Sequence, residues 1–203
     1  MKKIYLIISL ICLTYMTYGQ NNGNGTINGH EYVDLGLPSG LKWATCNVGA
    51  KSPEEYGDYF AWGEVNPKEK YTIENSFTNI KETTDISGNI KHDAATAKWG
   101  KSWRTPTKDE VDELFNNCTW EWAKQNETNG YKVTSKVNGN SIFIPAAGFY
   151  DGPFLYNAGK YGNYLSSTPY NEIYVYILFF DSNYKLYYGI NHHYGRTVRP
   201  VSD

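Results

Sequence analysis

The apolar positions follow a clear helical repeat in only one part of the chain. Val111, Leu114, Phe115 and Cys118 stand at i, i+3, i+4 and i+7. This spacing puts the apolar side chains on one face of a helix, because an α-helix turns about every 3.6 residues. The pattern predicts an amphipathic helix over Lys108–Asn117 with one stripe facing the core.

Both predicted helices begin at recognisable capping residues. Asp93 precedes the short run Ala94–Trp99, and Gly100 follows it, so these residues predict an N-cap and a C-terminal stop. Thr107 and Glu110 lie three residues apart at the start of the second helix. In a capping box, each of these side chains accepts a hydrogen bond from the other residue's backbone N–H.

The rest of the pattern predicts strands. Two short strands are expected at Tyr32–Asp34 and Lys42–Asn47, joined by the turn LPSG. Asn138-Gly139 splits GYKVTSKVNGNSIFIPAAG into a hairpin. IYVYILFF, beginning at Ile173, is apolar on both faces and predicts a central strand, with YKLYYG and RTVRPV as later strands. The polar stretch from Lys68 to His92 is predicted to be a loop. The order predicts an α+β fold with two helices on mostly antiparallel sheets.

Strand alternation assigns the residues of IYVYILFF to two faces. One face carries Ile173, Val175, Ile177 and Phe179. The other face carries Tyr174 and Tyr176. We expect the first face to meet the helices, because a sheet face covered by helices must be dry, and the tyrosine face to be the more exposed one.

The N-terminus predicts export. Residues 1–20 contain Lys2 and Lys3, then an apolar run, then Gly19, the pattern of a cleaved secretory signal peptide. Residues 21–30 are polar and rich in glycine, which predicts a flexible leader, and residues 31–203 form one predicted domain. Cys12 follows Ile11 rather than a small residue, so a lipid anchor is not favoured. We expect a secreted, periplasmic or cell-surface protein without a membrane span.

Charge and cysteines narrow the class of protein. Loss of residues 1–20 removes two lysines and leaves a net charge of −4. A mildly acidic chain without a basic stripe argues against nucleic acid as a partner. Cys46 and Cys118 remain after export, where an oxidising compartment allows a disulfide. Two separate buried thiols are the alternative.

The C-terminal part is unusually rich in tyrosine and asparagine. Nine of the nineteen tyrosines lie between Tyr161 and Tyr194. Tyrosine and asparagine suit an adaptable binding surface, but they also suit a sheet with one wet face. Because side chains alternate along strands, about half of the candidates are expected in the core. The candidate ligand-binding residues are Tyr164, Tyr170, Asn171, Tyr174, Tyr176, Asn183, Tyr184, Tyr187, Asn191, His192, His193 and Tyr194.

Six motifs carry a resemblance to a known family. HEYVDLGLPSGLKWATCNVGA, YGDYFAWGE, AATAKWGKSWRTPTKDEVDEL, IFIPAAGF, YLSSTPY and GRTVRPV occur in that order over residues 30–201. Together they resemble the Fibrobacter succinogenes major paralogous domain of secreted Bacteroidetes proteins. WRTPT and VRPV are also similar to the sulfatase-modifying factor and formylglycine-generating enzyme group. These resemblances imply a C-type-lectin-like fold.

The same fold implies a further relationship. Variable proteins of diversity-generating retroelements share it, and their C-terminal segments are mutated at adenines, which enriches asparagine and tyrosine. The segment from Tyr161 to Tyr194 resembles such a target. It departs from the common Trp-Ser-Ser-Thr pattern, because Leu165 stands where tryptophan is usual.

Metal, cofactor and catalytic signals are weak. His192 and His193 are adjacent and would point to opposite faces of a strand, so they predict no metal site. The calcium motifs of C-type lectins, Glu-Pro-Asn and Trp-Asn-Asp, do not occur in the sequence. The formylglycine-generating relatives use a late cysteine pair, and this chain has no cysteine after Cys118. We predict no cofactor and no enzyme activity.

The remaining polar and aromatic motifs have structural interpretations. Ser166 and Ser167 lack a nucleophile elbow and are expected to bond nearby backbone. The tryptophans of the motifs are expected in the core. Arg104 and Arg199 are expected to form buried ion pairs with Glu64 or Asp58.

Three functional hypotheses remain. The first is a secreted or surface ligand-binding module for a protein or glycan, using the Tyr/Asn-rich C-terminal face. The second is an enzyme of the sulfatase-modifying-factor-like fold group, which the missing late cysteines disfavour. The third is a structural envelope subunit whose Tyr/Asn face is covered by another chain.

Overall fold

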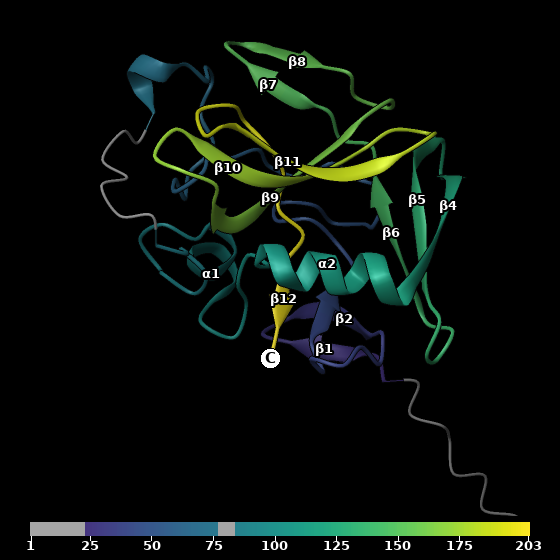
Figure 1. The fold of residues 1–203 in the computed structure, drawn as a ribbon. Coiled ribbons are helices and arrows are strands. Elements are labelled where there is room, and N and C mark those ends of the chain that lie inside the picture. The colour runs from purple at the N-terminus through teal and green to yellow at the C-terminus, as the bar shows by residue number, and fades with distance from the viewer. Residues whose placement is uncertain (1–22, 77–83) are drawn as a thin grey trace, which may run out of the picture.

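The computed structural model of the protein describes residues 23–76 and 84–203, and within them the fold is α+β (Figure 1). The helices are α1 (Ala94–Trp99), α2 (Lys108–Asn117) and the 3₁₀ helix η1 (Ile73–Asn75). The strands are β1 (Gly25–Ile27), β2 (His30–Asp34), β3 (Lys42–Ala44), β4 (Cys118–Gln125), β5 (Thr128–Ser135), β6 (Ser141–Pro145), β7 (Phe149–Asp151), β8 (Phe154–Tyr156), β9 (Gly162–Pro169), β10 (Tyr174–Phe180), β11 (Lys185–Asn191) and β12 (Val201–Ser202).

The strands form antiparallel sheets with the orders β1-β2-β3-β12, β11-β10-β9, β4-β5-β6 and β7-β8. The predicted hairpin around Asn138-Gly139 is confirmed as β5 and β6, and IYVYILFF is confirmed as the central strand β10. RTVRPV is mostly not a regular strand. It lies among several segments and forms single bridges, Arg196 to Phe60 and Thr197 to Tyr164, before β12.

The N-terminal boundary differs from the prediction. Gly25–Ile27 pair with His30–Tyr32 to form the edge of the first sheet, so a flexible leader reaching to residue 30 is wrong for this part. The predicted signal peptide, residues 1–20, lies outside the described residues. The predicted loop between Lys68 and His92 contains no helix except η1 among its described residues. Neither α-helix is long and apolar enough to cross a membrane in the part of the chain that the structure describes.

Helix α1 begins at a fully buried carboxylate. Asp93 accepts from the backbone N–H groups of Ala95 (3.0 Å) and Thr96 (3.4 Å), as predicted for an N-cap. It also accepts from the backbone N–H groups of Gly88 (2.8 Å) and Thr105 (2.9 Å). One side chain therefore fixes the helix, the loop before it and the strand-like segment after it.

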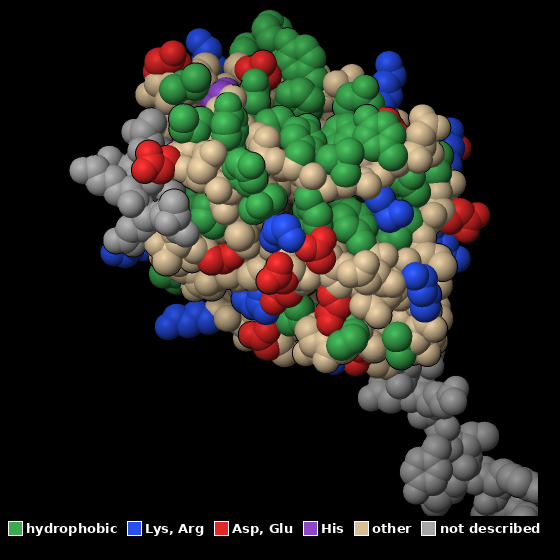
Figure 2. Space-filling model, in the orientation of Figure 1, with side chains coloured by type: hydrophobic (Ala, Val, Ile, Leu, Met, Phe, Trp, Pro, Cys, Tyr) green, Lys and Arg blue, Asp and Glu red, His purple; other side chains and the backbone are tan. Residues whose placement is uncertain are grey.

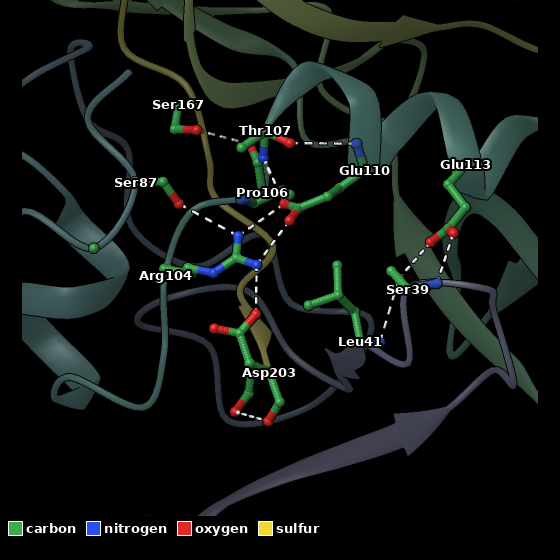
Figure 3. Close-up of polar contacts among 12 residues, drawn as sticks. Ser39, Leu41, Ser87, Arg104, Pro106, Thr107, Glu110, Glu113, Ser167 and Asp203 are labelled. Carbon is green, nitrogen blue, oxygen red and sulfur yellow. Dashed lines mark hydrogen bonds and ion pairs between the residues drawn. The ribbon is translucent and has the colours of Figure 1, made fainter. Parts of the chain in front are cut away.

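Helix α2 begins with the predicted capping box. The Glu110 N–H donates to the Thr107 hydroxyl at 3.3 Å, and the Thr107 N–H donates to the Glu110 carboxylate at 2.8 Å. The same carboxylate receives both Nη atoms of Arg104, at 2.8 and 2.7 Å, and Arg104 also contacts Asp203 at 2.7 Å (Figure 3). Arg104 therefore ties the helix start to the C-terminus. Its predicted ion pair with Glu64 or Asp58 is wrong.

Strand β10 separates the two main clusters of the core. Leu178 and Phe180 pack with Val111 and Leu114 of α2 on one side. The other face of β10 packs against α1 and the tryptophan-rich N-terminal loops, through Val175, Ile177 and Phe179. Trp43, Trp62, Trp99 and Trp103 are buried in these clusters, as expected from their motifs.

The predicted alternation of side chains along β10 is confirmed, but the predicted exposure of its tyrosine face is only partly right. Val175, Ile177 and Phe179 are buried together beside α1. Ile173 lies before the strand and is exposed. Helix α2 covers the opposite face, where Leu178 and Phe180 follow the tyrosines, so both faces are dry toward the end of β10. Only the beginning of the tyrosine face reaches solvent.

The two cysteines are free thiols, so the disulfide alternative is wrong for this structure. Cys46 follows β3 and is half-buried, with its sulfur 3.5 Å from the Thr45 hydroxyl oxygen. Cys118 opens β4 opposite Ser135 and belongs to the core beside α2. The thiols therefore belong to different elements. Burial raises the pKa of the Cys118 thiol to about 11.

Leu114→Ala tests the helix stripe. Leu114 is fully buried, so we expect a loss of about 2–5 kcal/mol in unfolding free energy from lost apolar transfer and the cavity left behind. Urea denaturation followed by circular dichroism measures it. Asn116→Ala, an exposed position of the same helix, is the matched control and should change stability by less than about 0.5 kcal/mol. Equal effects of the two changes would contradict the packing of α2.

Thiol labelling tests the cysteine assignment. Because its pKa is raised, the Cys118 thiol stays protonated near pH 8 and is shielded as well, so it should react slowly with iodoacetamide. Cys46 is partly accessible and should react first. Mass spectrometry of peptides from native and denatured protein locates each label. Failure of both cysteines to react even in denaturant without reductant would indicate a disulfide.

Candidate ligand-binding surface

Exposed apolar side chains gather in one part of the fold. Of twelve exposed large hydrophobic residues in the described chain, nine lie between Phe154 and Tyr188, so their distribution is not that of scattered surface residues. Figure 2 shows hydrophobic side chains concentrated over β7, β8, β10 and β11 in this view. We call these nine the aromatic surface, which extends over both faces of the sheet β11-β10-β9: Phe154, Leu155, Tyr156, Tyr170, Ile173, Tyr174, Tyr184, Leu186 and Tyr188.

The β7–β8 hairpin supplies the first part of the aromatic surface. Backbone bonds hold the hairpin at Tyr150, which pairs with Gly195, and at Gly152, which pairs with Tyr71. Phe149 stacks on Tyr156 with ring centroids 5.8 Å apart. Sequence reasoning missed this hairpin, although FYDGPFLY contains Asp-Gly, a common hairpin signal.

Strand β11 supplies the second part. It is an edge strand held by β10 alone, and the register places Tyr188 opposite Ile177 and Leu186 opposite Phe179. These side chains share one face, because directly opposed residues of an antiparallel pair point the same way. Phe179 supports the ring of Tyr188 at 5.7 Å and that of Tyr184 at 5.9 Å.

The opposite face of the same sheet carries a lysine among tyrosines. The Lys108 Nζ lies 5.7 Å from the ring of Tyr176 and 5.2 Å from that of Tyr187. The Tyr187 hydroxyl donates to the Lys108 carbonyl, which fastens β11 to the first turn of α2. Tyr170 meets Tyr176 edge to face at 5.1 Å. Only Tyr170 and Tyr174 are largely exposed here, so Tyr176 and Tyr187 have structural contacts as well.

Three predicted binding residues are in the interior. Tyr164 is 2% exposed, donates to the Pro145 carbonyl at 2.7 Å and accepts from Asn47 at 3.3 Å. His192 is buried and donates from Nδ1 to the Ile173 carbonyl at 2.9 Å. His193 is also buried, and burial lowers the pKa of its imidazole. Their assignment to an exposed binding face is therefore wrong.

The predicted asparagines have different surroundings. Asn171 is exposed, and its side-chain oxygen accepts from the N–H groups of Ile173 (2.9 Å) and Tyr174 (2.8 Å), which shapes the turn before β10. Asn183 is exposed in the β10–β11 turn. Asn191 is half-buried at the end of β11. Asn171 and Asn183 are therefore the exposed members of the three predicted asparagines.

Tyr194 and Arg196 join the two parts of the surface. The half-buried ring of Tyr194 packs against Phe149 of β7 at 5.7 Å and over the guanidinium of Arg196 at 5.1 Å. Arg196 is fully buried, and its charge also faces Tyr188 of β11. Burial lowers the pKa of Arg196 to about 9, so the guanidinium remains mostly cationic at neutral pH.

The two serines of β9 bond to nearby backbone. The Ser166 hydroxyl donates to the Tyr176 carbonyl at 2.8 Å, and that of Ser167 contacts the Pro106 carbonyl at 3.4 Å, which confirms their expected backbone bonding. Within residues 23–76 and 84–203, no group of three histidine, cysteine, aspartate or glutamate side chains could hold a metal. A hollow of about 440 Å³ lies elsewhere, between His30, Cys46 and Trp99.

Comparisons with protein-family models, with curated proteins and with solved structures found no match.

Proposed function

We propose that this protein is an exported ligand-binding module and that the aromatic surface carries recognition. The observation that supports this proposal is the concentration of exposed aromatic side chains over β8 and β11. The core is filled by other residues, including Trp62, Trp99 and Trp103, so these exposed side chains are not needed to fill it. Large exposed apolar patches on a folded domain commonly mark interaction sites. Tyrosine adds contact area with little ordering entropy, because only two side-chain torsions are frozen on binding.

The support beneath these residues favours the same role. The backbone of β11 is held by its full register with β10, while Tyr184, Leu186 and Tyr188 project outward. Their side chains therefore contribute area to a ligand from a rigid platform. A rigid platform reduces the entropy lost on binding.

The motif resemblances agree with this proposal. The domain resembles C-type-lectin-like modules of secreted Bacteroidetes proteins, and its Tyr/Asn-rich segment resembles the diversified segments of retroelement targets. Sequencing the neighbouring DNA tests diversification. A reverse transcriptase gene beside a near-copy of the segment that differs at adenines would support diversification. Absence of both would exclude it.

The two alternatives have weaker support. An enzyme of the sulfatase-modifying-factor-like group would need its late cysteine pair, and the chain has no cysteine after Cys118. A structural envelope subunit would have the aromatic surface covered by neighbouring copies or other subunits. Size-exclusion chromatography with light scattering on the purified protein separates self-assembly from monomeric ligand binding.

Alanine variants of the aromatic surface test the binding role. The labelled protein is screened on a glycan array and against phage-displayed peptides, and its hits are titrated with Tyr156→Ala, Tyr184→Ala and Tyr188→Ala. We expect at least one variant to weaken binding about tenfold, which corresponds to about 1.4 kcal/mol. Ile90→Ala and Val137→Ala remove exposed side chains outside the aromatic surface and should leave binding unchanged. Ligands whose affinity is unchanged by all three tyrosine substitutions would contradict the proposed site.

Export is tested by N-terminal sequencing. Protein recovered from the envelope or medium of an expressing bacterium should begin near residue 20 or 21, because the Lys2–Lys3 segment and the apolar run after it predict cleavage close to Gly19. A replacement of the apolar run by polar residues should keep the protein inside the cell. Recovery of exported protein that still begins at Met1 would refute cleavage.

A further inference from the structure

Two buried arginines of the C-terminal segment have very different surroundings. Arg199 is satisfied: its Nε donates to the Asn47 side chain at 2.8 Å, Nη1 to the Ala44 carbonyl at 3.1 Å and Nη2 to the Phe143 carbonyl at 3.0 Å. Arg196 is equally buried, with 0% of the residue exposed. It uses Nη1 alone. A structural role therefore accounts for the donors of Arg199 but not for those of Arg196.

The free donors of Arg196 lie on one edge of its guanidinium. Nη1 donates to the carbonyls of Asn191 (3.1 Å) and Tyr194 (3.4 Å). Nε and Nη2 are buried and have no hydrogen-bond partner among the described residues, and no salt bridge of Arg196 is found there. The ring of Tyr194 attracts the cation, but a ring face does not replace hydrogen bonds to a buried charge.

This free edge has the geometry of an anion receptor. Nε and Nη2 of a guanidinium point the same way and match the two oxygens of one carboxylate. The guanidinium also lies beside the aromatic surface, because Tyr194 packs over it and Tyr188 is its other electrostatic neighbour. Nε and Nη2 are shielded from solvent, so a ligand reaches them only if a covering side chain moves; the half-buried Tyr194 is the candidate.

We propose that Arg196 binds the carboxylate of an acidic sugar whose ring stacks on the neighbouring tyrosines. This inference rests on the proposed function, since the sugar would occupy the aromatic surface. A sugar acid fits better than a peptide C-terminus, because the exposed side chains nearby are tyrosines, whose rings can stack on a sugar ring while their hydroxyl groups exchange hydrogen bonds with it.

Nitrogen-15 NMR of the arginine side chains tests this proposal directly on the folded protein. Glucuronate is the probe, with glucose and potassium chloride at matched ionic strength as controls. Glucuronate should shift the Nε–H signal of Arg196, and neither control should do so. The Nε–H signal of Arg199 should stay in place, because its donors are already used. The Arg196 signal is assigned by its absence from Arg196→Gln.

The affinity of glucuronate gives a second readout. Arg196→Gln should weaken it about tenfold or more, as expected for loss of charge-assisted hydrogen bonds. If this variant does not fold, sequential resonance assignment of the wild-type protein identifies the Arg196 signal, and the wild-type spectra then decide the question. An unmoved Arg196 signal, an equal shift with chloride, or a shift with N-acetylalanine in place of glucuronate would each overturn the proposal.

The results also separate this inference from the proposed function. Ligands that require Tyr156, Tyr184 or Tyr188 but leave the Arg196 signal unmoved would remove the carboxylate site and keep the binding role. A glucuronate shift at Arg196 together with array hits that ignore those tyrosines would keep the anion site and remove the aromatic surface as the main site.

Discussion

The fold depends on a strand that must be dry on both faces. Val175, Ile177 and Phe179 of β10 belong to the cluster beside α1, and Leu178 and Phe180 to the cluster beside α2. Because side chains alternate along a strand, no residue in the second half of β10 can serve a ligand without opening one of the clusters. The proposed recognition surface is therefore confined to the strand's beginning, to β11 beside it, and to the β7–β8 hairpin.

The C-terminal segment places two arginines, Arg196 and Arg199, in the interior of the domain. Arg199 donates hydrogen bonds to the end of β3, to Asn47 and to β6. One buried cation therefore holds together segments that are distant in the sequence. Breaking such a buried, satisfied group is costly, because the remaining partners lose their hydrogen bonds without regaining water. Arg196, in the same segment, lacks this compensation. This contrast is the reason that Arg196, and not Arg199, is the proposed contact for a ligand.

Local signals in the sequence were sufficient for the helices, their caps, the hairpin after β5 and the alternation of β10. Each of these depends on residues close together in the chain, such as Thr107 and Glu110. The burial of Tyr164 and the partner of Arg104 depend on segments that meet only after folding, so spacing could not predict them. The tyrosine count indicated the region where exposed apolar side chains gather, but it could not separate Tyr188, which faces solvent, from Tyr164, which bonds to Pro145.

The pairing of β12 with β3 has a consequence for how the chain acquires its structure. Arg199 meets Ala44 across 155 residues of sequence, and Val201 completes the first sheet beside Trp43. Contacts this distant in sequence require the closure of a long loop, which slows folding. The first sheet cannot be completed until Val201 and Ser202 have left the ribosome. Until then β3 lacks its neighbour β12, so the N-terminal sheet remains incomplete while all the residues between the two strands are synthesised.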